Sequence, residues 1–416
     1  MKNAESYNLS NFFYGAGEDF FTLIGKYNDW YQQARPLGYD SYSIPLTTAP
    51  NSTVRVNHPE TQEEAELINL SSYNYLGLAT RKEVVDAAAA GLYEYGFGAS
   101  GSPILSGTYQ IFEDFQNEIA RFKKKEKCLV YPTGYGANVG FISALLRQGD
   151  HVIMDQYAHA SIVDGAVLSK AKLAYFRHND PENLEKKLVK LSRVGGKKLV
   201  VFEGVYSMDG DFCVLDEIVR LAKKYGASIL IDEAHSAFIF GENGRGVVEM
   251  YGLEDEIDFH LGTFSKSLGG IGGYVCASNK AMEYARAYSR SRFFSCALPP
   301  AVTAGLRKSL QLSIDEPHLR TKLKKNFALM KAKLADWGID TSSSQTQIVP
   351  VIIGEESKTF KIAKEILDKG VFVLPIVFPA VSVNKGRLRI SISATLDESQ
   401  ISFAAETIAT AINKYN

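Results

Sequence analysis

The sequence contains few cysteines and no long apolar run. Its four cysteines lie far apart and form no C-x-x-C pair: Cys128, Cys213, Cys276 and Cys296. This spacing is typical of a reducing compartment and lacks the paired pattern of a zinc site, so we expect no metal. No window reaches the roughly 20 apolar residues of a membrane span, and the N-terminus has no basic region followed by an apolar stretch. We therefore expect a cytoplasmic protein, with peripheral membrane contact left open.

The chain also lacks an excess of charge of either sign. Its 416 residues include 46 Lys and Arg against 47 Asp and Glu, and the basic clusters are short, as at Lys123-Lys124-Lys125. A nucleic-acid surface usually needs a concentrated basic patch. We therefore expect no nucleic-acid partner.

A further absence bears on the tetrapeptide D-E-A-H at residues 232–235, which is the spelling of a helicase-type ATPase box. Such an ATPase needs the phosphate loop G-x-x-x-x-G-K-[ST], and that string does not occur. The G-x-G-x-x-G match at residues 96–101 follows a predicted helix instead of a strand, and Pro103 comes after it. Neither nucleotide-binding interpretation holds, so the carboxylate and imidazole of D-E-A-H need another explanation.

The order of apolar runs predicts an α/β fold. CLVYP, HVIMD, KLAYF, KLVVFEG, ASILIDEAH, DFHLGTFSK and GGYVCAS read as buried strands, and several are separated by amphipathic helical stretches. This pattern indicates a mostly parallel sheet covered on both faces. We expect an aromatic-rich, irregular segment at residues 1–66, a large domain at 67–309 and a smaller α+β domain at 310–416.

Ligands of open α/β sheets bind beyond the carboxyl ends of the strands, and four features of the chain gather at such positions. Lys266 follows a predicted strand in LGTFSKSLGGIGGYV, and Asp232 ends another. His159 lies in YAHAS, and Gly134-Tyr135 open a helix. Pyridoxal phosphate (PLP) needs a lysine for a Schiff base, a carboxylate at its ring nitrogen, a stacking ring and a helix N-terminus for its phosphate. The chain offers one residue or segment for each.

The chain resembles the α-oxoamine synthases, PLP enzymes of fold type I. The resemblance covers residues 66–395 and rests on SYNYLG, YPTGYGANVG, DQYAHASI, FRHND, EGVYSMDGD, IDEAHSAFIFGENGRG, GTFSKSLGGIGGY, SCALPP and RLRISISA. It implies an aspartate-aminotransferase-like fold and an acyltransferase that condenses an amino acid with an acyl thioester and releases carbon dioxide. YNYLG and GTFSKS look most like the serine palmitoyltransferase branch. That branch implies L-serine, palmitoyl-CoA, the product 3-ketodihydrosphingosine and a role in sphingolipid biosynthesis.

The resemblance also implies roles for individual residues. Lys266 would carry PLP and act as the base, Asp232 would pair with the ring nitrogen, and His159 would stack on the ring. His235 would bind the ring hydroxyl, and Arg389 in RLRIS would bind the substrate carboxylate. The remaining implied contacts are to the phosphate, the cofactor edge and the substrate: Gly134, Tyr135, Thr263, Ser265, Ser207, Glu203, Asn74 and, from the partner of a homodimer, Ser295.

Several alternatives stay open. Arg387 alternates with Arg389 on one strand, Glu203 could be an ordinary strand-end acid, and Asn74 could only set a turn. Pro103, Cys296 and Leu396 depart from residues common in the family. The departures at Pro103 and Leu396 leave the substrates undecided: glycine, alanine or cysteate instead of serine, and a carrier protein instead of coenzyme A. An aminotransferase and a silent subunit of a heterodimeric synthase are the rival functions, and the presence of Lys266 argues against the second.

Overall fold

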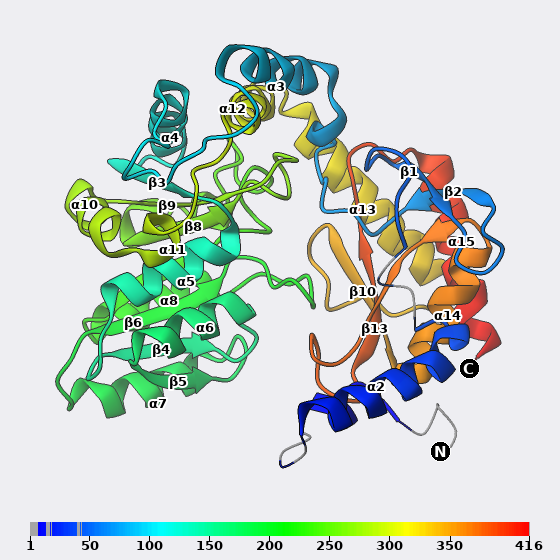
Figure 1. The fold of residues 1–416 in the computed structure, drawn as a ribbon. Coiled ribbons are helices and arrows are strands. Elements are labelled where there is room, and N and C mark those ends of the chain that lie inside the picture. Colours follow the sequence, from blue (N-terminus) through cyan, green and yellow to red (C-terminus); the bar gives the residue numbers. More distant parts are fainter. Residues whose placement is uncertain (1–6, 14–16, 18, 40–41, 43, 416) are drawn as a thin grey trace. The chain divides into compact units, whose positions relative to one another are not determined.

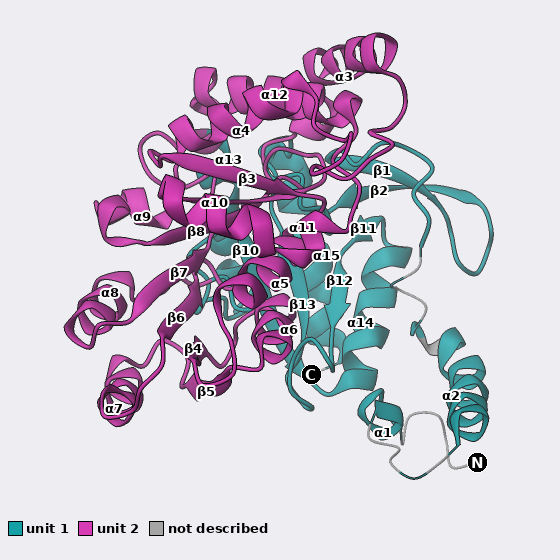
Figure 2. Cartoon of the chain, turned by 60° about the vertical axis from the view of Figure 1, so that its left-hand side comes forward, with its two compact units in different colours: residues 1–75, 208–210, 322–416 teal, residues 76–207, 211–321 magenta. Residues whose placement is uncertain are grey.

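The structure is a computed structural model that describes residues 7–13, 17, 19–39, 42 and 44–415. The chain divides into two compact units (Figure 2). Unit 1 comprises residues 1–75, 208–210 and 322–416, and unit 2 comprises residues 76–207 and 211–321. These units do not coincide with the three expected segments, whose boundaries remain a prediction.

Unit 2 is built around a seven-stranded sheet with the order β3-β9-β8-β7-β6-β4-β5. Its strands are β3 (Lys127–Tyr131), β4 (His151–Asp155), β5 (Lys172–Phe176), β6 (Lys198–Glu203), β7 (Ser228–Asp232), β8 (Phe259–Thr263) and β9 (Gly273–Ala277). Pairing is parallel from β8 through β5, while β9 is antiparallel to both β3 and β8. The expected mostly parallel sheet is therefore confirmed.

Helices separate most of these strands along unit 2 and also flank them at both ends of the unit in the chain (Figure 1). They are α3 (Lys82–Tyr95), α4 (Gln110–Phe122), α5 (Gly134–Leu145), α6 (Ala160–Ser169), α7 (Pro181–Ser192), α8 (Leu215–Lys224), α9 (Val247–Met250), α10 (Asn279–Tyr288), α11 (Arg290–Phe293) and α12 (Pro300–Asp315). Phe141 of α5, Ile162 of α6 and Met282 of α10 pack in one apolar cluster with Val152 of β4 and Leu230 of β7. Each such side chain contributes roughly 1.5–3 kcal/mol when it is fully buried.

Unit 1 contains two three-stranded sheets, β1-β2-β11 and β10-β13-β12. Their strands are β1 (Thr53–Asn57), β2 (Glu64–Asn69), β10 (Ile348–Gly354), β11 (Val371–Phe372), β12 (Leu374–Ile376) and β13 (Gly386–Ser391). The helices α14 (Glu356–Asp368) and α15 (Glu398–Lys414) belong to this unit, and α13 (His318–Asp336) leads into it from unit 2. β2 runs parallel to β11, and this pairing joins the N-terminal region to the C-terminal one.

The expectation of an irregular segment at residues 1–66 was wrong. The described part of this segment contains α1 (Ser10–Phe13), α2 (Phe20–Ala34) and the hairpin of β1 and β2. Asp19 caps α2 by accepting hydrogen bonds from the backbone N–H groups of Phe21 and Thr22, and Trp30 is buried against Tyr39. Aromatic residues that looked irregular in sequence thus form a small core of their own. In the described chain, no helix is both long and apolar enough to cross a membrane.

Candidate active site

A cavity of about 340 Å³ lies in unit 2 where several strands of the sheet end. Asp232 ends β7, Glu203 ends β6 and Thr263 ends β8, and all three line the cavity. Because parallel strands end at the same edge of the sheet, residues far apart in sequence meet there. Of the residues expected to form the site, those that line the cavity are Gly134, Tyr135, His159, Glu203, Asp232, His235, Thr263, Ser265 and Lys266.

Asp232 is buried and firmly oriented. Its Oδ2 accepts a hydrogen bond of 2.8 Å from Nδ2 of Asn138, and its Oδ1 accepts one of 2.9 Å from the backbone N–H of Ala234. Hydrogen bonds to a carboxylate favour its ionised form. His235, three residues further on, is also buried and lines the same cavity. The structure thus presents a fixed carboxylate and a nearby imidazole to a bound ligand.

The N-terminus of α5 and two hydroxyl groups form an anion-binding corner. Thr133 caps α5 by accepting a hydrogen bond of 2.8 Å from the backbone N–H of Gly136. A Cβ atom at Gly134 would lie 2.9 Å from Cβ of Thr263, so a side chain there would crowd this corner. The hydroxyl oxygens of Thr263 and Ser265 are 2.7 Å apart. Backbone N–H groups at a helix N-terminus with hydroxyls beside them suit a phosphate.

His159 lies just before α6 and is held from two sides. Its backbone N–H donates a hydrogen bond of 2.7 Å to Oε1 of Glu203, and its Nδ1 lies 2.7 Å from Oγ of Ser161. Partial burial lowers the pKa of His159; the nearby Asp232 carboxylate opposes this effect, and the Lys266 ammonium reinforces it, so the net direction is downward. We therefore expect a neutral imidazole at neutral pH, which can stack on a flat ligand.

Lys266 is half-buried and lines the cavity from the loop after β8. This loop turns sharply, because the backbone N–H of Gly269 donates a hydrogen bond of 2.9 Å to the carbonyl of Lys266. Gly269 has a φ of +71°, and a Cβ atom there would lie 2.4 Å from the backbone nitrogen of Ala79. Only glycine fits that position, which explains one of the glycines that follow Lys266.

The donor set fits PLP. The cavity combines a phosphate-binding corner, a fixed carboxylate, an imidazole and a primary amine, and the cofactor requires one group of each kind.

Four expected residues do not line this cavity. Ser207 and Ser295 belong to unit 2 and are half-buried outside the lining. Asn74 and Arg389 belong to unit 1, and Nδ2 of Asn74 donates a hydrogen bond of 3.0 Å to the carbonyl of Pro50. Their participation in the site therefore remains a prediction.

Arg389 nevertheless has the properties of an anion-binding residue. Its side chain is only 4% exposed, and its Nη1 donates a hydrogen bond of 2.9 Å to the hydroxyl of Tyr73. Nε and Nη2 are buried and have no hydrogen-bond partner in the described part of the chain. Arg387, two residues earlier on β13, is instead paired with the carboxylate of Asp209 at 2.8 Å. Unpaired buried donors are costly, so Arg389 is the better prepared of the two to bind a carboxylate.

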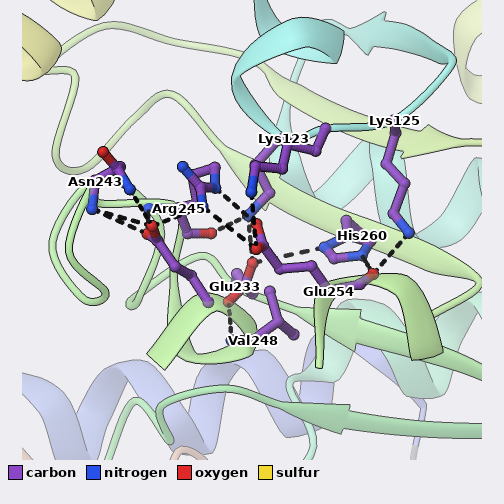
Figure 3. A network of polar contacts seen from close by, with 10 residues as sticks. Lys123, Lys125, Glu233, Asn243, Arg245, Val248, Glu254 and His260 are labelled. Atoms are coloured by element: carbon purple, nitrogen blue, oxygen red, sulfur yellow. Dashed lines mark hydrogen bonds and ion pairs between the residues drawn. The ribbon is translucent and has the colours of Figure 1, made fainter. Parts of the chain in front are cut away.

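Glu233 belongs to the D-E-A-H tetrapeptide but does not line the cavity. Figure 3 shows it in a separate network, in which its carboxylate pairs with the Lys123 ammonium. Burial disfavours the charge of Glu233, yet Lys123 and His260 outweigh this effect and lower its pKa to about 2. A Cβ atom at Gly246 would lie 2.0 Å from Oε1 of Glu233, so the glycine leaves room for this carboxylate. The tetrapeptide thus presents Asp232 and His235 to the cavity and anchors Glu233 in the core.

Asn138 is a site residue that the sequence analysis missed. It is buried on α5 and hydrogen-bonds both Asp232 and the hydroxyl of Ser161. The available signal was an asparagine in a mostly apolar helix, GYGANVGFISAL. Its significance depends on the neighbouring strand β7, which only the folded chain brings close.

The family model described as aminotransferase class I and II matches residues 65–408. Among curated relatives, the 8-amino-7-oxononanoate synthase of Citrifermentans bemidjiense is 43% identical over 346 residues, which are 82% of this chain and 88% of that protein. The enzyme of the same name from Alkaliphilus metalliredigens is 40% identical over 87% of this chain and 91% of its own length.

Solved structures of the same group of enzymes also match this chain. A serine palmitoyltransferase from S. paucimobilis with bound PLP and myriocin matches with a TM-score of 0.90 and 33% identity, over 95% of this chain and 99% of that one. The serine palmitoyltransferase of Sphingomonas wittichii has a TM-score of 0.89 and 34% identity over the same shares. The 8-amino-7-oxononanoate synthase of Francisella tularensis, with 24% identity and a TM-score of 0.71 over 84% of this chain and 98% of that one, supports the fold alone.

Proposed function

Because the chain belongs to the α-oxoamine synthase family of PLP-dependent acyltransferases, which join an amino acid to an acyl thioester, we propose that it condenses L-serine with palmitoyl-CoA and releases carbon dioxide. The observation that supports the condensation chemistry is that Lys266, Asp232 and His159 line the same cavity as the anion-binding corner.

Each residue of the cavity would have a separate role in the reaction. Bound PLP supplies an electron sink for the negative charge that develops on the substrate's Cα. Lys266 would hold the cofactor through its amine and then take the Cα proton at Nζ. Asp232 would keep a proton on the ring nitrogen, because an opposite charge raises the pKa of that nitrogen. His159 would stack on the ring, and His235 would orient its hydroxyl.

The remaining contacts would hold the phosphate and fix the substrate. Gly134, Tyr135, Thr263 and Ser265 would bind the phosphate, with Ser207 at the cofactor edge. The family is typically dimeric, and we propose a cytoplasmic homodimer in which Ser295 reaches the phosphate held by its partner. Asn74 and Arg389 would bind the amino acid, whose correct orientation of the Cα–H bond lowers the barrier to proton removal.

Replacing Arg389 with lysine should raise the KM for the amino acid by about 10- to 100-fold, since charge-assisted hydrogen bonds contribute roughly 1.5–3 kcal/mol. Lysine keeps the charge but loses the planar pair of donors that matches a carboxylate. Steady-state kinetics with the acyl thioester at saturation would measure the effect. Arg387→Lys is the matched control, because the Arg387 guanidinium is already paired with Asp209. A larger KM increase in the control would transfer the carboxylate-binding role to Arg387.

Two observations point to different amino acids. The serine palmitoyltransferase structures match 95% of this chain, including part of the N-terminal region. The 8-amino-7-oxononanoate synthases are up to 43% identical over a somewhat smaller share of it. The product named for those relatives carries a methyl group on its amino-bearing carbon, so its synthesis by this reaction requires alanine. Serine would leave a hydroxymethyl group there instead.

A substrate panel tests the proposal. Serine, glycine, alanine and cysteate would each be combined with palmitoyl-CoA, with the same acyl group on a carrier protein and with a dicarboxylic acyl thioester. We expect carbon dioxide and free thiol only with serine and palmitoyl-CoA. A preference for alanine with the dicarboxylic donor would reject serine, and activity only with the carrier protein would reject coenzyme A. Amino-group transfer to a keto acid without thiol release would support an aminotransferase.

A further inference from the structure

Two carboxylic acids lie side by side at the edge of the cavity. Glu203 ends β6 and Asp232 ends β7, and the two residues are register partners in the parallel pairing of these strands. Glu203 is 3% exposed and Asp232 is 5% exposed, and both line the cavity. Two buried carboxylates at such close positions cannot both ionise at low cost, so one of them tends to keep its proton.

The hydrogen bonds decide which acid keeps the proton. Asp232 accepts hydrogen bonds on both of its oxygens, from Asn138 and from the backbone of Ala234. Glu203 accepts a single one within the described chain, from the backbone N–H of His159 to Oε1. Since each donated hydrogen bond favours the ionised form of a carboxylate, Glu203, which accepts fewer of them, is the acid that keeps a proton, on Oε2.

Burial and the neighbouring carboxylate favour the neutral form of Glu203 as well. Burial raises the pKa of Glu203 well above its usual value, and the charge of Asp232 adds to this effect, while the hydrogen bond from His159 and the Lys266 ammonium oppose it. The titratable groups that face Glu203 are Asp232 on β7, Asp155 at the end of β4, Tyr206 after β6, His159 before α6 and Lys266 after β8.

We propose that Glu203 is a neutral carboxylic acid at physiological pH, and that it donates a hydrogen bond from Oε2 to the ligand in the cavity. Asp232 then has a neutral neighbour in Glu203 instead of a second negative charge. Glu203 positions the ligand and His159 together, because its other oxygen holds the backbone of His159. This inference rests on the proposed use of the cavity as the PLP site.

Infrared spectroscopy of the cofactor-free protein tests the protonation state directly. The spectrum of Glu203→Gln is subtracted from that of the unchanged protein at pH 7.5, with uniform ¹³C-glutamate labelling to identify the band. We expect a protonated carboxyl C=O band that the variant lacks and that shifts with the label. Equal intensity in the two proteins would mean that Glu203 is ionised, and the inference would be overturned.

Thermal unfolding of the cofactor-free protein provides a second measurement. An acid with a raised folded-state pKa stabilises the fold fully below its unfolded pKa, and this contribution is lost as pH rises toward the folded pKa. The melting temperature of Glu203→Gln should therefore rise relative to that of the unchanged protein as the pH increases from 5 to 8. A constant difference, or the opposite trend, would contradict a neutral Glu203.

Cofactor binding separates positioning from simple packing. Glutamine keeps both an acceptor for His159 and a donor toward the ligand, whereas alanine keeps neither. We expect the dissociation constant for PLP to be at least about tenfold higher in Glu203→Ala than in Glu203→Gln, the cost of leaving one buried polar group unpaired. Equal affinities would remove the donor role. If the unchanged protein bound no PLP, the proposed function would fail, while the infrared result would still decide the state of Glu203.

Discussion

Replacing Lys266 with alanine should abolish covalent attachment of PLP and reduce condensation by about a thousandfold or more. Lys266 is the amine that lines the cavity beside Asp232, and a positioned base alone contributes roughly 10²–10⁴-fold to such reactions. Attachment would be measured by borohydride reduction followed by peptide mass spectrometry, and turnover by release of carbon dioxide. PLP should still bind to the Lys266→Ala variant without a covalent bond, because the variant retains the anion-binding corner and Asp232.

The matched control for this experiment is Lys280→Ala. Lys280 is exposed on α10 and lies outside the cavity lining. The Lys280→Ala substitution removes the same kind of side chain from the same unit, so any general effect of losing a lysine appears in both variants. A Lys266→Ala protein that condensed its substrates as fast as the control would refute the assignment of Lys266.

Replacing Lys123 with methionine should lower the free energy of unfolding by about 3–5 kcal/mol, the usual cost of leaving one charge of a buried ion pair uncompensated. The Lys123 and Glu233 side chains are 1% and 0% exposed, so water cannot replace the lost partner. Lys123 also donates a hydrogen bond to the carbonyl of Arg245, and this bond would be lost as well. Urea unfolding of the cofactor-free protein followed by circular dichroism would measure the change.

Two further variants show whether the ion pair is responsible. Lys124→Met changes a neighbouring lysine that is 57% exposed, and such surface substitutions usually stay within about 0.5 kcal/mol. Combining Lys123→Met with Glu233→Gln removes both charges, so the double variant should recover part of the lost stability, with a coupling energy that reports their interaction. If Lys123→Met were as stable as Lys124→Met, the pair would contribute nothing.

Much of the fold was predictable because the signals are local. Short apolar runs of the length of a strand gave the sheet of unit 2, and residues that directly follow those runs gave most of the cavity lining. Lys266, Asp232 and His159 are separated by many residues, yet Asp232 ends a strand, His159 directly precedes a helix and Lys266 lies in the loop just after a strand. A parallel sheet brings such positions to one edge.

The errors and omissions involve long-range contacts. The aromatic residues before β1 form a helix whose Trp30 packs against Tyr39, a contact that periodicity alone does not reveal. Asn138 matters because its amide reaches Asp232 on another strand. Glu203 could be read from sequence only as a strand-end acid, and the pairing of β6 with β7 shows which carboxylate lies beside it.

The sequence by itself pointed to the cofactor and to the lysine and carboxylate that would serve it, because pyridoxal phosphate needs those residue types beyond the ends of strands. The type of condensation followed from the resemblance of its motifs to the α-oxoamine synthases. Only the tertiary structure decided the direction in which each side chain points. Adjacent Asp232 and Glu233 have the same charge and local setting, yet the first meets an amide at the cavity and the second a buried ammonium in the core. The partners that separate them come from distant parts of the chain, and burial makes their presence decisive.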